Sequence, residues 1–348
     1  MTISQAQQIH EIADDPLAAM DYCYAQGWTD GLPVIPPEEG RVQAMLAMEG
    51  RPPETVLAHH PATGLELTVH AAAANAVMAG CLPEYFPIIV AAFEAMDREP
   101  FNFHGSTVST GGSGHLLIVS GPIVDEINMN AGVNLFGPGN RANATIGRCI
   151  RLTLMNVFKI VPGIADKSTQ GNPGKYSFCI AERADKNPWP ALCEEVGYPE
   201  GVSSVTVFAG AGFCNVENHG ANTPETLLDT MADAMANYGC ISTGQSVVVF
   251  SPEHVEIIAR HGWSKAQVRE YLFEHAKRPR KDLERLGKFE NGFNAQDKQD
   301  CHRGVSPDDI LITVGGGDAG GHSAFIPSWS RSRGSMMQTQ SIGVCIDC

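Results

Sequence analysis

Short apolar runs alternate with segments of helical spacing along this chain. Each run is continuous and bounded by turn residues, which is typical of strands buried on both faces of a parallel sheet. Strand and helix signals in alternation predict an α/β fold with mainly parallel sheets. The predicted strands lie at residues 115–120, 204–209, 246–250 and 310–314, and the predicted helices at 5–27, 38–48, 66–79, 85–96, 142–157, 224–237, 253–259 and 265–276.

The two halves of the chain share a weak internal similarity. In each half a small-residue helix that ends in Gly-Cys precedes a strand that ends near a Ser. This pattern predicts two similar lobes or a duplicated α/β unit, with a ligand cleft at the Gly-rich loops, and 348 residues suffice for two such units. The predicted division is 1–60 for N-terminal helices and a Pro-rich arm, 61–200 for the first lobe and 201–348 for the second.

Charge and composition exclude several classes of partner. The net charge is −15 with 43% hydrophobic residues, so we expect a globular protein without a nucleic-acid partner. The basic run at 277–281 is typical of a solvated helix end. No export signal and no apolar run of about 20 residues is evident, which predicts a cytoplasmic chain without a membrane partner. Its ten cysteines are then expected to be mostly reduced core thiols.

A polar cluster at residues 134–148 combines a Gly-Pro-Gly turn with the start of a helix. Backbone amides at a helix N-terminus and an arginine fork attract carboxylate or phosphate groups. The alternative is a helix cap with a structural turn, but two asparagines and an arginine exceed what capping requires. The predicted substrate-binding residues here are Gly137, Gly139, Asn140, Arg141 and Asn143.

A second loop leads from residue 169 to Cys179. In an extended segment Lys175, Ser177 and Cys179 would face one side, and a neighbouring lysine favours the thiolate that a nucleophile needs. This predicts Cys179 and Lys175 as catalytic residues and Ser177 as a substrate ligand. A buried cysteine in a strand at 176–180 is the alternative.

The third cluster, at 315–323, is glycine-rich and directly follows a predicted strand. Ligands in open α/β sheets bind beyond the carboxyl ends of strands. We therefore predict Gly320 and Gly321 as substrate-binding residues and His322 as an acid or base. A purely conformational role is the alternative.

Histidines elsewhere form no HExxH or Cys-x-x-Cys…His pattern, so no metal centre is predicted from spacing alone. The segment 213–220 contains both Glu217 and His219 and is the best alternative for metal or acid/base chemistry. A loop with satisfied side chains explains it almost as well.

Cys345 and Cys348 form a Cys-x-x-Cys at the C-terminal end of the sequence. Such a pair can close a disulfide, hold a soft metal or act as a thiol relay, which makes both residues catalytic candidates. The flanking sequence is not that of a thioredoxin motif, and a frayed tail is the alternative.

Four motifs stand out: GWTDGLPV at 27–34, NAVMAGC at 75–81, FGPGNRANATIGR at 136–148 and NPGKYSFC at 172–179. Together they resemble a largely uncharacterised bacterial family. The resemblance covers most of the chain and implies association with small thiol or selenol proteins that carry a UGSC motif, and hence redox or sulfur chemistry. It implies no catalytic residues, and the terminal Cys-x-x-Cys is outside the pattern.

Three functions follow as hypotheses. The first is a thiol-dependent enzyme, preferably an oxidoreductase, acting on a small anionic organic substrate by redox or carbon–sulfur chemistry. The second is a hydrolase or lyase in which Glu217, His219 and His322 act as acid/base groups or hold a metal. The third is a non-catalytic subunit of an enzyme complex. No cofactor is identified; a homo-oligomer and a small thiol protein partner are expected.

Overall fold

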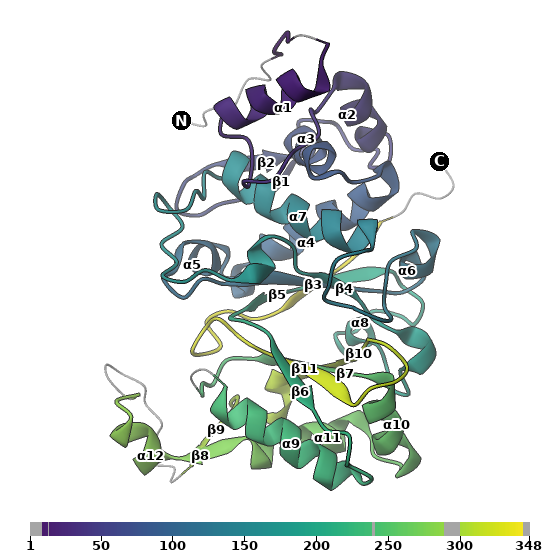
Figure 1. Cartoon of the computed structure of the whole chain (residues 1–348), viewed down its shortest axis with the longest axis vertical. Helices are drawn as coiled ribbons and strands as arrows, with labels where there is room; N and C mark the ends of the chain where they lie inside the picture. Colours follow the sequence, from purple (N-terminus) through teal and green to yellow (C-terminus); the bar gives the residue numbers. More distant parts are fainter. Residues whose placement is uncertain (1–8, 13, 239–240, 289–299, 344–348) are drawn as a thin grey trace.

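The computed structural model describes residues 9–12, 14–238, 241–288 and 300–343. Two four-stranded sheets lie face to face in the middle of the molecule, and helices cover the outer face of each (Figure 1). The protein is therefore an α/β fold with four layers. None of the helices in these ranges has the length and apolar run needed to cross a bilayer.

The first sheet has the strand order β12, β5, β3, β4. Strand β3 pairs in parallel with β4 and antiparallel with β5, which pairs antiparallel with β12. Strand β12 comes from near the end of the sequence, so distant segments close this sheet. The bounds are Gly114–Ser120 for β3, Cys179–Ala181 for β4, Ser204–Gly210 for β5 and Gln338–Ser341 for β12.

The second sheet has the order β10, β7, β11, β6 and repeats the same series of one parallel and two antiparallel pairs. The prediction of mainly parallel sheets is therefore wrong: both sheets are mixed. Strands β6 and β12 are short and carry no apolar run, and β11, although largely buried, follows directly on a glycine-rich loop. The bounds are Cys214–Glu217 for β6, Ser246–Phe250 for β7, Ile310–Val314 for β10 and His322–Pro327 for β11.

Continuous apolar strands have two buried faces, and the structure shows what each face contacts. Leu116 and Ile118 of β3 meet Val247 and Val249 of β7 between the sheets, whereas the alternate β3 residues pack against helices. The inner layer therefore holds the two sheets together. Its other members include Leu135, Phe178, Ile180, Leu192, Phe208, Leu311, Ala324 and Ile326.

The helices occupy the two outer layers. Helices α3 (Val69–Ala79), α4 (Phe86–Met96) and α7 (Arg141–Asn156) cover the first sheet. Helix α4 is apolar on nearly all sides because it is enclosed by its neighbours. The second sheet is covered by α9 (Pro224–Asn237), α10 (Pro252–Arg260) and α11 (Lys265–His275) (Figure 1).

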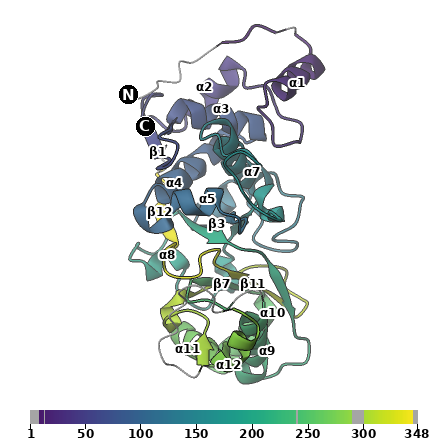
Figure 2. The same cartoon turned by 90° about the vertical axis from the view of Figure 1, so that its left-hand side faces the viewer.

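The N-terminal segment lies outside the helical layer of the first sheet, with α1 and α2 at the far end of the molecule (Figure 2). Helix α1 begins later than predicted because Asp15 caps it and Pro16 occupies its first turn. The segment 66–79, predicted to be all helix, starts with a short strand. The bounds are Pro16–Ala25 for α1, Glu39–Leu46 for α2, Val56–His59 for β1 and Glu66–Thr68 for β2.

The remaining elements are short and connect these layers. They are α5 (Phe103–Val108), α6 (Ile123–Glu126), α8 (Leu192–Glu195), α12 (Arg280–Arg285), β8 (Lys277–Pro279) and β9 (Asp300–His302), with 3-10 turns at Pro83–Tyr85, Glu99–Phe101, Pro173–Lys175, Ala184–Lys186 and Pro307–Asp309.

The predicted boundary at residue 200 does not follow the sheets. Strands β5 and β12 lie in the predicted second lobe, yet both belong to the first sheet. Hydrogen bonding across β5 therefore ties together the ranges 61–200 and 201–348.

Helix α7 approaches β4 closely through Gly147. A Cβ there would lie 2.7 Å from the Phe178 amide nitrogen and against Ser177 Oγ. We expect Gly147→Ala to lower the free energy of unfolding by about 1–3 kcal/mol, measured by urea denaturation. The control is Gly40→Ala on exposed α2, where a Cβ meets nothing within 4 Å. That change should be neutral or stabilising, so equal losses in both variants would contradict close packing at Gly147.

Candidate functional site

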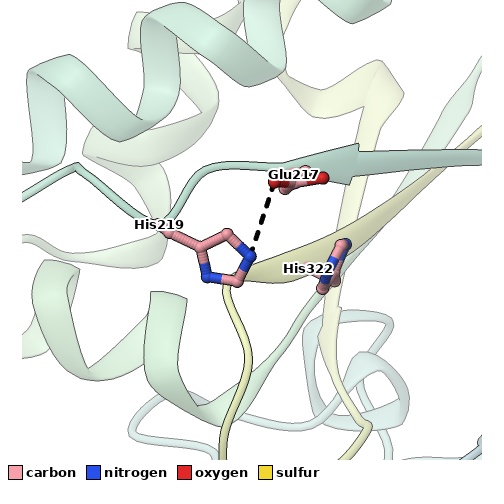
Figure 3. Close-up of side chains that lie close together, drawn as sticks. All are labelled: Glu217, His219 and His322. Atoms are coloured by element: carbon pink, nitrogen blue, oxygen red, sulfur yellow. Dashed lines mark ion pairs between the residues drawn. The ribbon is translucent and has the colours of Figure 1, made fainter.

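Glu217, His219 and His322 come together at one end of the second sheet. Their ligand atoms all lie within 4.8 Å of one another. Glu217 Oε1 is 3.5 Å from His219 Nε2, and the two imidazole rings meet edge to face with centroids 5.2 Å apart (Figure 3). All three residues are exposed. We call them the Glu-His-His cluster.

Strand pairing places two members of this cluster. Strands β6 and β11 are antiparallel, and Glu217 stands opposite His322 in their register. Val216 faces the helices, so the period of two in a strand directs Glu217 to the other face. Neither strand was predicted, so the sequence alone could not join these residues.

Asn218 brings His219 back beside Glu217. Its side-chain oxygen accepts hydrogen bonds from the amides of Gly220 and Ala221, at 3.0 and 2.8 Å, which is the geometry of an Asx turn. Its amide group donates to Thr230 Oγ1 of α9 at 2.7 Å. The turn is thereby fixed to the helix layer below.

His254 of α10 connects the two cluster-bearing segments from behind. Its Nδ1 lies 2.7 Å from Ser323 Oγ and its Nε2 3.0 Å from the Asn218 carbonyl oxygen. Burial lowers the pKa of His254, which favours the neutral ring with Nε2–H donating to Asn218. His254 thus positions neighbours of both Glu217 and His322.

The glycine-rich loop before β11 touches the cluster through its backbone. A Cβ at Gly321 would collide with the Asn218 carbonyl group, so only glycine permits this approach. The Gly321 amide donates to His219 Nδ1 at 3.3 Å, and the Gly320 amide donates to Glu253 at 2.6 Å. Gly320 and Gly321, predicted as substrate ligands, shape this loop.

Two imidazoles and one carboxylate are a donor set for Zn²⁺ or another first-row divalent ion. Ligand atoms about 2.0–2.2 Å from a tetrahedral ion are about 3.3–3.5 Å apart, close to the 3.5 Å between Glu217 and His219. Three protein ligands at an exposed site leave positions for water or substrate. The residues present therefore fit a catalytic type of metal centre.

The hydrogen bonds of His219 and His322 determine which ring nitrogen of each histidine is free to bind a metal. Because His219 Nδ1 accepts from the Gly321 amide, a neutral ring carries its proton on Nε2, facing Glu217. Coordination through Nε2 requires that proton to leave and the amide to move away from Nδ1. His322 Nδ1 contacts the Asn215 side-chain amide at 3.2 Å, and a rotated amide would accept from Nδ1–H and leave Nε2 free.

The predicted anion site at 134–148 consists mainly of internal bonds. The Asn140 side chain caps α7 by accepting a hydrogen bond from the Asn143 backbone amide at 3.1 Å. The Asn143 side chain accepts from the Asn130 backbone amide and donates to the carbonyl oxygens of Asn130 and Cys179. Arg141 is exposed and donates to the Gly80 carbonyl oxygen at 3.0 Å. In the turn, the Gly137 amide donates to Asn134 O and Gly139 takes a φ of 131°. Capping accounts for these contacts, and anion binding stays a prediction.

The thiol candidate at residue 179 is in an unfavourable setting. Cys179 is buried, and burial together with Cys81 raises the pKa of its thiol, which disfavours the thiolate. The expected extended segment is wrong, because Pro173–Lys175 form a 3-10 turn. Lys175 bonds Asp166 and Ser168, each at 2.6 Å, while Ser177 Oγ donates to the Asn143 carbonyl oxygen. Cys345 and Cys348 lie outside the described residues.

Sequence reasoning missed Asn215, His254 and Ser323, which surround the cluster. Asn215 carried a signal, since it alternates with Glu217 in the segment already selected. His254 had none, because a histidine in an amphipathic helix looks like any buried polar residue.

Comparisons with protein-family models, with curated proteins and with solved structures find no match to this chain.

Proposed function

We propose that this protein is a metal-dependent hydrolase or lyase whose metal ligands are Glu217, His219 and His322. The observation that carries the proposal is the convergence within 4.8 Å of Glu217 on β6, His219 in the turn that follows it and His322 on β11. A divalent ion held there supplies a bound water of lowered pKa and a Lewis acid for a substrate carbonyl.

The surrounding residues act on the geometry of this cluster. His254 and Asn218 hold His219 beside β6, and Asn215 lies within reach of the His322 ring. The Gly320 and Gly321 amides border the cluster, so the glycine-rich loop is the expected edge of the substrate site. The substrate is accordingly a small molecule that reaches an open surface.

A second candidate is acid/base catalysis without a metal. The hydrogen bond from the Gly321 amide to His219 Nδ1 favours it, because this bond keeps the His219 proton on Nε2 toward Glu217. Glu217 would then accept the proton of an attacking water and pass it on to the leaving group, while the His219 Nε2–H holds the Glu217 carboxylate in place.

The thiol-dependent oxidoreductase ranks lower. Burial of Cys179 and the pairing of Lys175 with Asp166 remove its main support. Experiments on the purified protein can test four further hypotheses: catalysis by Cys345 and Cys348, a small thiol protein partner, a homo-oligomer and a role as a non-catalytic subunit.

Metal binding tests the proposal directly. The chelator-treated protein is dialysed against Zn²⁺ or Co²⁺, and bound metal is counted by plasma mass spectrometry. We expect one ion per chain in the wild type and at least about 100-fold weaker binding in Glu217→Gln and His322→Gln, because each loses a direct ligand.

Matched controls remove the same chemical groups elsewhere. Glu200→Gln and His261→Gln change an exposed carboxylate and an exposed imidazole and should bind metal like the wild type. Equal binding in all variants, or none in the wild type, would overturn the metal centre. A chelator-resistant hydrolase activity lost in Glu217→Gln would then support the acid/base pair.

A further inference from the structure

Phe213 immediately precedes β6, the strand that carries Glu217, and places an aromatic side chain beside the open side of that strand. Phe213, Asn215 and Glu217 are alternate residues and are all exposed, whereas Cys214 and Val216 pack toward the helices. Phe213 exposes 43% of its surface. An open face thus runs from an aromatic ring at one end to the Glu-His-His cluster at the other.

A second aromatic ring from the first half of the chain supports Phe213. The Phe136 and Phe213 ring centroids are 4.8 Å apart, and Phe136 is anchored in turn by Phe178 of the inner layer at 6.0 Å. These spacings are within the range of favourable aromatic pairs. Phe136 and Phe213, the aromatic ledge, are therefore held in place while Phe213 keeps an exposed surface.

The turn that contains Phe136 is also joined to the loop that leads into His322. The Gly316 amide donates to the Ala131 carbonyl oxygen at 2.9 Å, and a Cβ at Gly317 would lie 3.0 Å from Val133 Cγ2. Val133 itself exposes 76% of its surface. The loop that leads into His322 is therefore tied to the segment that carries Phe136.

We propose that the aromatic ledge binds the apolar end of the substrate while its metal-binding oxygen group lies at the Glu-His-His cluster. This inference rests on the proposed metal-dependent function and adds the substrate class. The substrate carries a carboxylate, amide or ester oxygen at one end and an aromatic or branched apolar group at the other.

Strand geometry sets the length of such a molecule. Phe213 and Glu217 are four positions apart, and at about 3.3 Å per residue of extended chain their Cα atoms are about 13 Å apart. Both side chains extend over the same face and take up part of this span. The two ends of the substrate are therefore separated by roughly 10 Å, a length that a three-carbon linker to a phenyl ring provides.

Two hydroxamates that differ only by a phenyl ring test this inference. Hydroxamates chelate Zn²⁺ and Co²⁺, and butyrohydroxamate and 4-phenylbutyrohydroxamate have the same metal-binding group. Their affinities for the Co²⁺-loaded protein are measured from the change in the visible spectrum of cobalt. We expect the phenyl compound to bind about tenfold more tightly to the wild type.

Variants then locate the phenyl contact. In Phe213→Ala the tenfold preference should disappear while the affinity for butyrohydroxamate stays unchanged. Ile164→Ala removes an apolar side chain that is 71% exposed at another site and should keep the full preference.

The outcomes separate the two proposals. Equal affinities in the wild type, or a preference that survives in Phe213→Ala, would overturn the aromatic ledge as the binding surface while leaving the metal centre intact. Failure of the wild type to bind Co²⁺ would instead overturn the proposed function and, with it, this inference.

Discussion

Acidification from pH 6.5 to pH 4 should destabilise the protein steeply, largely through two buried histidines. Burial, reinforced by His104, lowers the pKa of His60 to about 4, and burial with nearby Arg151 lowers that of His115 to about 3. In the unfolded chain both titrate near 6.5, so below that pH the unfolded state binds more protons. Each histidine then costs about 1.4 kcal/mol per pH unit, down to its folded pKa.

Urea denaturation of the wild type and of His60→Gln at several pH values measures this effect. Above pH 6.5 the His60 contribution is fully present, and it is lost as the pH falls toward 4. The variant should lose stability less steeply by about 1.4 kcal/mol per pH unit in this window. Comparing the two proteins cancels the change in overall charge, so parallel curves would refute the role of His60.

The second large effect concerns Asp166, a buried carboxylate shared by buried Arg151 and half-buried Lys175. It accepts from Arg151 at 2.8 Å and Lys175 at 2.6 Å, and also from the Ser168 amide and hydroxyl groups. Burial alone would raise the pKa of Asp166, but the hydrogen bonds from Lys175 and Ser168 lower it well below its ordinary value. Asp166→Asn removes the only negative charge among these partners, and we expect a loss of about 3–5 kcal/mol.

The matched control is Glu284→Gln, which neutralises an exposed carboxylate paired with Arg280 on one helix. Exposed pairs of this kind contribute about 0.3–0.5 kcal/mol. Urea midpoints at pH 7 give both values. Similar losses in the two variants would show that the Asp166 network contributes no more than a surface pair.

Sequence patterns predicted the buried centre of the fold well. Strands β3, β5, β7 and β10 were located because both of their faces are covered, which leaves continuous apolar runs. Helices α4 and α9 were likewise placed close to their observed bounds. Burial on both sides is a property that residue type alone reveals.

Edge strands and pairing partners were not predictable in the same way. Strand β6 has the sequence CNVE and β12 has QTQS, so neither carries an apolar run, and β11 follows directly on glycines. Sheet direction depends on these strands, which explains why both sheets were expected to be mainly parallel.

For the candidate site too, the residue types were recognisable in the sequence but the contacts between them were not. Glu217, His219 and His322 were each selected by residue type, but their meeting depends on pairing between segments about a hundred residues apart, as in the contact of Asn215 with His322 across 107 positions. The expected alignment of Lys175 with Cys179 is wrong for a local reason: the 3-10 turn at Pro173–Lys175 breaks the alternation of an extended segment.

Strand β12 completes the first sheet by pairing with the outer edge of β5. Until the ribosome has synthesised residues 338–341, β5 keeps an unpaired edge, with backbone groups open to other chains. The first sheet therefore reaches its final form only after residues 338–341 have been made. Chains that end before residue 338 leave this edge of β5 unpaired, and through such an edge they can pair with other chains and aggregate.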